Sequence, residues 1–229
     1  MDGGRLLPDG LAAPLAAAGS VARIGPNAIT QVAAVLADTV GDAAGGALFA
    51  HAGISGHWAE PPTAMVDDRD VERLHAVLRA ELGLTAARRI GWQAGVRTGD
   101  YLLAHRIPAP AQRVLKWLPA PLAGRTLLAA IRRHAWTFTG AGRFSAMPDP
   151  RRARTWRLTI AHGPIARAAA AKPSAHNTRE PHEPVCDFYA ATFERLFRTL
   201  VDPRTTVREL ACEALGDPAC VFELVCGER

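Results

Sequence analysis

Hydrophobic residues recur three and four positions apart over much of the first half of the chain, which is the spacing of an amphipathic helix. Five segments follow this pattern, and helices are therefore predicted at residues 27–40, 67–82, 85–105, 108–121 and 124–140. Gly83 is expected to end the second helix as a C-cap, because glycine readily adopts the backbone conformation found there.

The hydrophobic period changes to two in the second half of the chain. Apolar and polar residues alternate from Thr155 to Ile160, which predicts a strand, and the residues around Phe144 are expected to form its partner. A helical pattern returns over residues 186–201. Two strands, at residues 206–214 and 219–225, are predicted to close the chain as a hairpin around an LGDP turn.

The 229 residues are enough to bury a substantial core without covalent cross-links. Residues 166–184 have no apolar period and are rich in proline and charge, so a loop or mobile linker is expected there. The predicted organisation is an N-terminal extension at 1–24 and a single domain at 25–229, with a helical half at 25–140 and a strand and helix half at 141–229.

Charge is unevenly distributed along the sequence. Residues 79–157 contain 15 basic and 3 acidic residues, whereas the remainder contains 12 basic and 19 acidic residues. This cationic segment is either a solvated arginine-rich surface or a surface that faces an anionic membrane or an acidic small molecule. Nucleic acid is not an expected partner, because no helix-turn-helix, zinc-finger or aromatic RNA-binding signature accompanies the charge.

Hydropathy and cysteine usage indicate the compartment. No run of about 18 apolar residues is present, so no membrane-spanning helix is predicted. The apolar stretch at residues 11–20 contains Pro14 and lacks a preceding basic cluster, which argues against a secretory signal. We therefore expect a cytoplasmic protein, in which clustered cysteines favour metal binding over disulfides.

Three glycines, Gly91, Gly95 and Gly99, recur every four residues within the predicted helix at 85–105. Each glycine costs a helix about 1 kcal/mol relative to alanine, so something must approach this face closely. Another helix packed there and a flat ligand lying against the bare backbone both explain the spacing.

Cys212 and Cys220 flank the turn of the predicted C-terminal hairpin. In a hairpin centred on Gly216 they lie directly opposite each other, with Cβ atoms about 4.5 to 5.5 Å apart, near enough to share one Zn²⁺ ion. Cys226 is a poor third ligand, because six residues along a strand correspond to about 20 Å.

Cys186 is a better third ligand than Cys226. It lies in the first turn of the helix predicted at 186–201, where the helix dipole is expected to lower the pKa of the thiol. Asp187, His182 and Glu209 are candidates for the fourth position. Ordinary buried thiols without a metal are the alternative.

Several stretches are specific as a set, among them RIGPNAITQ, AGVRTGDYLLAHRIPAPAQ, FYAATFERLFRTLV and the terminal CEALGDPACVFEL. Together they resemble the bacteriochlorophyll 4-vinyl reductase family, the J protein of bacteriochlorophyll gene clusters, whose second half is a 4-vinyl reductase domain. The resemblance covers nearly the whole chain from Arg23 onward.

The resemblance implies an α+β fold with helices packed on an antiparallel sheet, a ligand-binding domain of the nitric-oxide-signalling and Golgi-transport type. Related domains in aromatic-sensing regulators bind structural zinc through three cysteines and a glutamate, which match Cys186, Cys212, Cys220 and Glu209. An offset of three on a regular strand points Glu209 away from Cys212, so this ligand set requires a β-bulge or an early strand end. The related adaptors also make a homodimer plausible.

The family name implies reduction of a vinyl group on a magnesium porphyrin. No G-x-G-x-x-G follows a predicted strand, and no flavin or iron-sulfur spacing is present. We therefore favour a tetrapyrrole-binding protein that binds or delivers a vinyl intermediate of the divinyl protochlorophyllide type to the bacteriochlorophyll biosynthetic enzymes. The alternatives are the vinyl reductase itself, using NADPH, and a regulatory or assembly adaptor without a ligand of its own.

The expected ligand pocket lies among the helices of residues 85–140. His134 is the expected magnesium ligand, with aromatic rings covering the macrocycle and arginines pairing with its carboxylates. The full set is Gly91, Gly95, Gly99, His105, Arg106, His134, Trp136 and Phe138. Peripheral contact with the photosynthetic membrane is left open.

Overall fold

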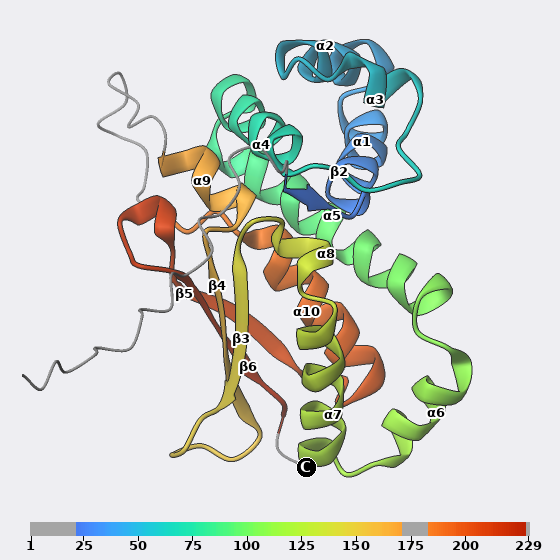
Figure 1. Cartoon of the computed structure of the whole chain (residues 1–229), viewed down its shortest axis with the longest axis vertical. Helices are drawn as coiled ribbons and strands as arrows, with labels where there is room; N and C mark the ends of the chain where they lie inside the picture. The colour runs from blue at the N-terminus through green and yellow to red at the C-terminus, as the bar shows by residue number, and fades with distance from the viewer. Residues whose placement is uncertain (1–21, 171–182, 228–229) are drawn as a thin grey trace, which may run out of the picture.

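The computed structural model describes residues 22–170 and 183–227, and in it a helical part precedes an antiparallel sheet along the chain (Figure 1). The helices of the first part are α1 (Asn27–Thr39), α2 (Asp42–His51), α3 (Ser55–Ala59), α4 (Asp68–Leu82), α5 (Leu84–His105), α6 (Ala109–Trp117), α7 (Ala120–Arg133) and α8 (Trp136–Thr139). Among the described residues, no helix has the length and apolar character needed to cross a bilayer.

Two antiparallel sheets are present. The small one pairs β1 (Arg23–Ile24) with β2 (Val66–Asp67). The large one has the strand order β3-β4-β6-β5 and is formed by β3 (Arg143–Pro148), β4 (Thr155–Ala161), β5 (Thr206–Ala211) and β6 (Cys220–Val225). The remaining elements are α9 (Pro164–Ala170), α10 (Asp187–Leu200) and the 3-10 turn η1 (Glu213–Leu215).

Most predicted elements of the first half are confirmed, and α4 illustrates why. The Asp67 side chain accepts a hydrogen bond from the backbone N–H of Arg69 at 2.9 Å and caps the start of the helix. Gly83, at φ 76°, ends it as expected. The predicted helix at 124–140 is corrected, because α7 starts earlier, at Ala120, and the chain leaves helical geometry at His134 before α8.

Helices α2 and α3 were not predicted from the sequence. The residues of α2 are mostly small and form no apolar stripe, so the periodicity that reveals a helix is missing. The helix is held by packing instead, because the Trp58 indole lies where a Cβ on Gly45 would be, 2.2 Å from its nearest atom. Only glycine admits the ring at this distance.

Helix α9 begins inside the segment expected to be a loop. Its residues Pro164–Ala170 overlap the start of the 166–184 region, so the loop prediction is corrected there, and residues 171–182 lie outside the described part of the chain. The domain also begins slightly earlier than expected, because Arg23 and Ile24 form β1.

Helix α10 is the centre of the core, between the sheet and α5. Aromatic side chains make its contact with the sheet, including Phe193 against Phe222 at a ring-centroid distance of 6.1 Å and Phe197 against Trp156 at 6.2 Å. Phe197 and Phe222 are fully buried, and each such side chain contributes roughly 2 to 3 kcal/mol to stability. This packing fixes the start of α10 relative to β5 and β6.

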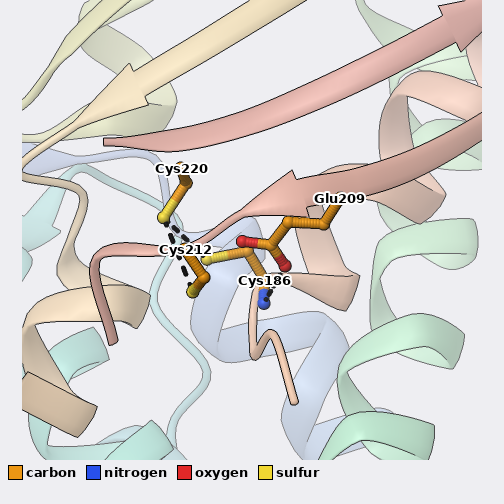
Figure 2. A group of neighbouring side chains, drawn as sticks. All are labelled: Cys186, Glu209, Cys212 and Cys220. Atoms are coloured by element: carbon orange, nitrogen blue, oxygen red, sulfur yellow. Dashed lines mark hydrogen bonds between the residues drawn. The ribbon is translucent and has the colours of Figure 1, made fainter. Parts of the chain in front are cut away.

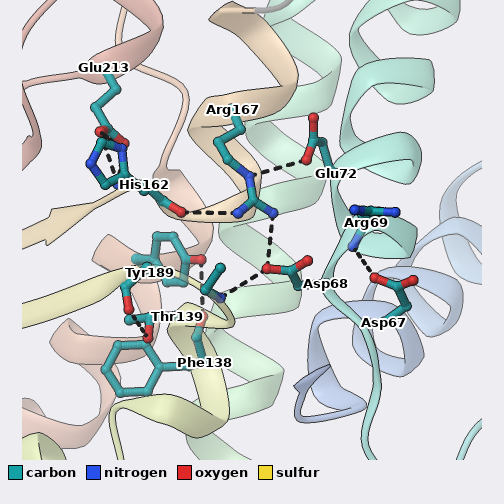
Figure 3. Close-up of polar contacts among 12 residues, drawn as sticks. Asp67, Asp68, Arg69, Glu72, Phe138, Thr139, His162, Arg167, Tyr189 and Glu213 are labelled. Carbon is teal, nitrogen blue, oxygen red and sulfur yellow. Dashed lines mark hydrogen bonds and ion pairs between the residues drawn. The ribbon is translucent and has the colours of Figure 1, made fainter. Parts of the chain in front are cut away.

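A buried ion-pair network joins the helical part to α9 (Figure 3). Arg167 lies 3.0 Å from the carboxylate of Asp68 and 3.1 Å from that of Glu72, both on α4. Asp68 also accepts a hydrogen bond from the backbone N–H of Ala141 at 3.0 Å. The nearly inaccessible Asp68 carboxylate is therefore compensated on two sides, as a buried charge requires.

Candidate metal centre

Four side chains distant in the sequence meet at one end of the sheet (Figure 2). Cys186, Glu209, Cys212 and Cys220 each offer one ligand atom, and these four atoms all lie within 4.8 Å of one another. The Sγ atoms of Cys186 and Cys220 are 3.4 Å apart, and those of Cys220 and Cys212 are 3.8 Å apart. The three cysteines are buried.

The C-terminal hairpin aligns Cys212 with Cys220. Strand β5 ends at Ala211, which pairs with Val221, so the next residues on the two chains are Cys212 and Cys220. The turn between them is closed by Asp217, whose carboxylate accepts a hydrogen bond from the Cys212 N–H at 2.8 Å. Gly216 supplies the left-handed conformation, with φ 95°.

A β-bulge brings Glu209 to the same side as the cysteines. The register of β5 against β6 shifts between Glu209 and Ala211, which is the irregularity that the sequence required for this residue. Glu209 Oε2 accepts a hydrogen bond from the backbone N–H of Cys186 at 2.9 Å. This contact joins β5 to the residue that caps α10.

The donor set fits a tetrahedral zinc ion. Four bonds of about 2.3 Å in tetrahedral geometry place sulfur atoms about 3.8 Å apart, close to the observed spacings of 3.4 and 3.8 Å. Glu209 Oε1 is buried and has no hydrogen-bond partner among the described residues. A cation would satisfy this oxygen. Four protein ligands leave no open coordination position, so such a site is structural rather than catalytic.

The cluster distributes protons unevenly among its members. Hydrogen bonds with Cys212 and Cys220, together with burial, raise the pKa of Cys186, so the expectation that the helix dipole lowers it is wrong. The same hydrogen bonds lower the pKa of Cys212, which is the thiolate of the cluster. Burial and the charge of Cys212 raise the pKa of Glu209 to about 9. Metal binding would therefore displace protons from several of these groups.

Two basic residues on α4, His75 and Arg79, line a cavity beside the cluster. The cavity has a volume of about 10 Å³ and is also lined by Val185, which is about the space for one water molecule. His75 Nε2 and Arg79 Nη2 are buried and have no hydrogen-bond partner in the described chain. Burial lowers the pKa of Arg79, and the neighbouring Cys186 and Cys212 oppose this shift.

The sequence analysis missed His75 and Arg79. Both lie on the stripe of α4 that also carries Val71, Leu74 and Leu78. Polar residues at apolar positions of an amphipathic helix are the signal that could have identified them.

The other proposed ligands lie elsewhere or outside the described residues. Asp187 forms a salt bridge with Arg88 at 2.9 Å rather than joining the cluster. His182 is outside the described part of the chain. The buried Cys226 thiol accepts a hydrogen bond from Thr205 Oγ1 at 3.4 Å.

The glycine face of α5 is covered by α10. A Cβ on Gly95 would lie 2.3 Å from the Phe188 carbonyl oxygen, and one on Gly99 would lie 2.7 Å from the Arg195 side chain. Gly91 has more space and lines the small cavity beside the cluster. The close approach that these glycines allow is therefore a helix-helix contact.

The remaining residues of the expected ligand pocket are at the surface or in the core. His105 and Arg106 are exposed at the end of α5. Phe138 is half-buried and contacts other rings, including Phe144 at 5.4 Å between centroids. His134 and Trp136 are exposed between α7 and the start of α8.

The sequence of this chain matches known proteins over both its C-terminal part and its whole length. The family model of the 4-vinyl reductase domain matches residues 168–225, which include all four members of the cluster. The chain is 40% identical over 203 residues to the bacteriochlorophyll synthase 23 kDa chain of Cereibacter sphaeroides, covering 89% of this chain and 90% of that protein. It is 39% identical to the protein of the same name from Rhodobacter capsulatus, with 88% and 86% covered.

Similar solved structures include H-NOX proteins. An unliganded Fe(II) H-NOX protein mutant from K. algicida has a TM-score of 0.58 at 10% identity, with 90% of this chain and 98% of that chain covered. An H-NOX protein from S. oneidensis in the Fe(II)NO ligation state has a TM-score of 0.53 at 7% identity, with 90% and 100% covered. At such identities the likeness concerns the fold alone, and it confirms the predicted α+β class.

Proposed function

Because this chain belongs to the family of the bacteriochlorophyll synthase 23 kDa chain, we propose that it binds a magnesium-porphyrin vinyl intermediate and presents it for reduction. The family gives the chain a role in bacteriochlorophyll biosynthesis. Binding and delivery are the finer proposal, and the observation that carries it is the state of one histidine.

His134 has the arrangement of a metal-ligating imidazole. Its Nδ1 lies 2.9 Å from the carbonyl oxygen of Ala130, and because a carbonyl can only accept, Nδ1 carries the proton. Metal-binding histidines commonly donate their other ring N–H to a backbone carbonyl in this way, which fixes the tautomer and the ring orientation. The Nε2 lone pair of this exposed side chain is then available to a central magnesium.

The surroundings of His134 suit a planar anionic macrocycle. Trp136 is 60% exposed and offers an aromatic face within two residues of the imidazole. Arg132 and Arg133 are exposed at the end of α7, and guanidinium groups pair well with carboxylates such as propionates. The fold adds weaker support, since one H-NOX structure of TM-score 0.54 was solved to probe haem distortion, although fold alone does not assign a ligand.

Zinc is the proposed metal of the Cys186, Glu209, Cys212 and Cys220 cluster. Its role is structural, because the ion would tie the C-terminal hairpin to the start of α10. That helix packs between the sheet and α5, so the cluster would stabilise the body that carries His134.

The proposal is tested by titrating the purified full chain with magnesium protoporphyrin IX while recording the Soret band and the tryptophan fluorescence. We expect a saturable red shift with fluorescence quenching, and about tenfold weaker binding for His134→Ala. The matched control is His51→Ala, because His51 is also an exposed histidine but lies on α2. Unchanged spectra would refute pigment binding and favour an adaptor without a ligand.

Catalysis is tested separately from binding. Incubation of the protein with divinyl protochlorophyllide and NADPH should leave the vinyl group intact if the chain only presents the pigment. Formation of the ethyl product by this protein alone would contradict that role and establish a reductase.

A further inference from the structure

The surface formed by α6 and α7 is entirely cationic. Residues 101–148 contain seven basic residues and no acidic residue. All seven are exposed, and none of them forms an ion pair within residues 22–170 and 183–227. They are Arg106, Arg113, Lys116, Arg125, Arg132, Arg133 and Arg143.

Large apolar side chains are exposed at the bend between these two helices. Trp117, the last residue of α6, is 93% exposed, and Val114, one turn before it, is 58% exposed. Leu122 in the first turn of α7 is 50% exposed. Residues three apart on a helix share a face, so Val114 and Trp117 point the same way. A tryptophan exposed to this degree is unusual in a protein that meets only water.

The arrangement of α6 explains why this surface is accessible. Leu115 is the buried residue that anchors α6 to the rest of the protein. Figure 1 shows α6 at the periphery, on the far side of α7 from the strands of the sheet. The bend at Leu118 and Pro119 therefore projects its apolar residues outward, between basic residues on both helices.

We propose that the α6–α7 hairpin (residues 109–133) docks on the surface of an anionic lipid bilayer. Tryptophan and aliphatic side chains insert at the headgroup level, where an amphipathic ring has both an apolar and a polar environment. The unpaired Arg113, Lys116 and Arg125 would neutralise lipid phosphates, and the absence of acidic residues removes any repulsion. The complementary charge favours lipid over a second copy of this chain, whose corresponding surface is equally cationic.

This docking does not depend on the proposed pigment binding, since it requires only the surface residues. It is tested by co-flotation of the full chain, without pigment, with phosphatidylcholine vesicles that contain or lack about a third of phosphatidylglycerol. We expect binding to the anionic vesicles, little binding to the neutral ones, and release at about 0.5 M salt because screening weakens surface electrostatics.

Variants separate a specific docking surface from net charge. Trp117→Ser and Lys116→Glu should each lower the fraction bound to anionic vesicles about tenfold. Arg208→Glu, an equal charge reversal at an exposed position of β5, should leave it unchanged. Absence of binding to anionic vesicles, or equal losses for Lys116→Glu and Arg208→Glu, would overturn the proposal. So would conversion of a dimer into a monomer by Trp117→Ser in a protein that ignores vesicles, which would make this surface a self-interface.

Discussion

The Sγ atoms of Cys186 and Cys220 lie 3.4 Å apart although 34 residues separate them in the sequence. Cys186 precedes the first residue of α10, and Cys220 is the first residue of β6. A metal ion between them would fasten the final hairpin to the helix at the centre of the core. The cluster is therefore expected to govern the stability of the whole domain.

Replacing Cys212 by serine should remove the metal and much of the stability. The native protein is expected to contain about one zinc per chain by elemental analysis, and the variant close to none. An ion present at about a thousand times its dissociation constant stabilises the folded state by roughly 4 kcal/mol. The melting temperature should therefore fall by roughly 10 °C in a protein of this size.

Cys226 provides the matched control for this experiment. Its thiol is buried like the others, but it contacts Thr205 rather than the cluster. Cys226→Ala should retain the full zinc content. Native protein without zinc, when purified without chelator, would contradict the structural-metal interpretation.

Arg79 should tune the affinity of the metal centre through its charge. Three thiolates and one carboxylate around a divalent ion leave a net charge of about −2, and the Arg79 guanidinium is close enough to interact with Cys186 and Cys212. Arg79→Gln should weaken zinc binding about 10- to 100-fold, as is usual for groups that support metal ligands. Arg79→Lys keeps the positive charge and should retain most of the affinity, measured by competition with a chromophoric chelator. Equal losses in the two variants would indicate a packing effect.

The metal ligands could be predicted from the sequence where local geometry decided the outcome. The spacing of Cys212 and Cys220 around Gly216 indicated a hairpin pair, and the offset of Glu209 demanded the bulge that β5 contains. The pKa of Cys186 could not be predicted, because it depends on hydrogen bonds with two cysteines that only the tertiary fold brings near.

Long-range packing limited the rest of the prediction. The spacing of Gly91, Gly95 and Gly99 showed that a close neighbour was needed, but not that α10, from the other half of the chain, supplies it. Helix α2 had no detectable period because the ring of Trp58 replaces an apolar stripe.

Gly95→Ala should destabilise the protein through the contact between α5 and α10. The new Cβ would lie 2.3 Å from the Phe188 carbonyl oxygen, and a backbone atom cannot turn aside as a flexible side chain does. Overpacking of this kind costs roughly 1 to 3 kcal/mol, which should exceed the gain of about 1 kcal/mol in helix propensity. The urea midpoint of unfolding should therefore fall.

Gly91→Ala is the control on the same helix, one turn earlier. Its Cβ would meet the Phe188 nitrogen at 3.7 Å, an ordinary contact distance. Here the helix-propensity gain is unopposed, and stability should rise by up to about 1 kcal/mol. Destabilisation by Gly91→Ala as large as that by Gly95→Ala would show that the glycines serve something other than this helix contact.

His75 should make the stability of the protein depend on acid. Burial, with the charge of Arg79, lowers the pKa of His75 to about 3, whereas an unfolded histidine titrates near pH 6.5. Between these values the unfolded chain binds more protons than the folded protein, so the stability contribution of the neutral ring is present above about pH 6.5 and is lost as the pH falls toward 3. The free energy of unfolding should drop by about 2 kcal/mol from this group between pH 7 and pH 5.

A comparison with His75→Gln isolates this effect from acid release of the metal. The variant keeps a polar side chain on α4 and the same four cluster residues, so any proton-linked loss of zinc is common to both proteins. Urea unfolding at pH 7 and pH 5 should give a decrease about 2 kcal/mol smaller for the variant than for the native protein. An identical decrease in the two would mean that His75 is already protonated in the fold, and that the unpartnered Nε2 has found an acceptor in the cavity beside Arg79.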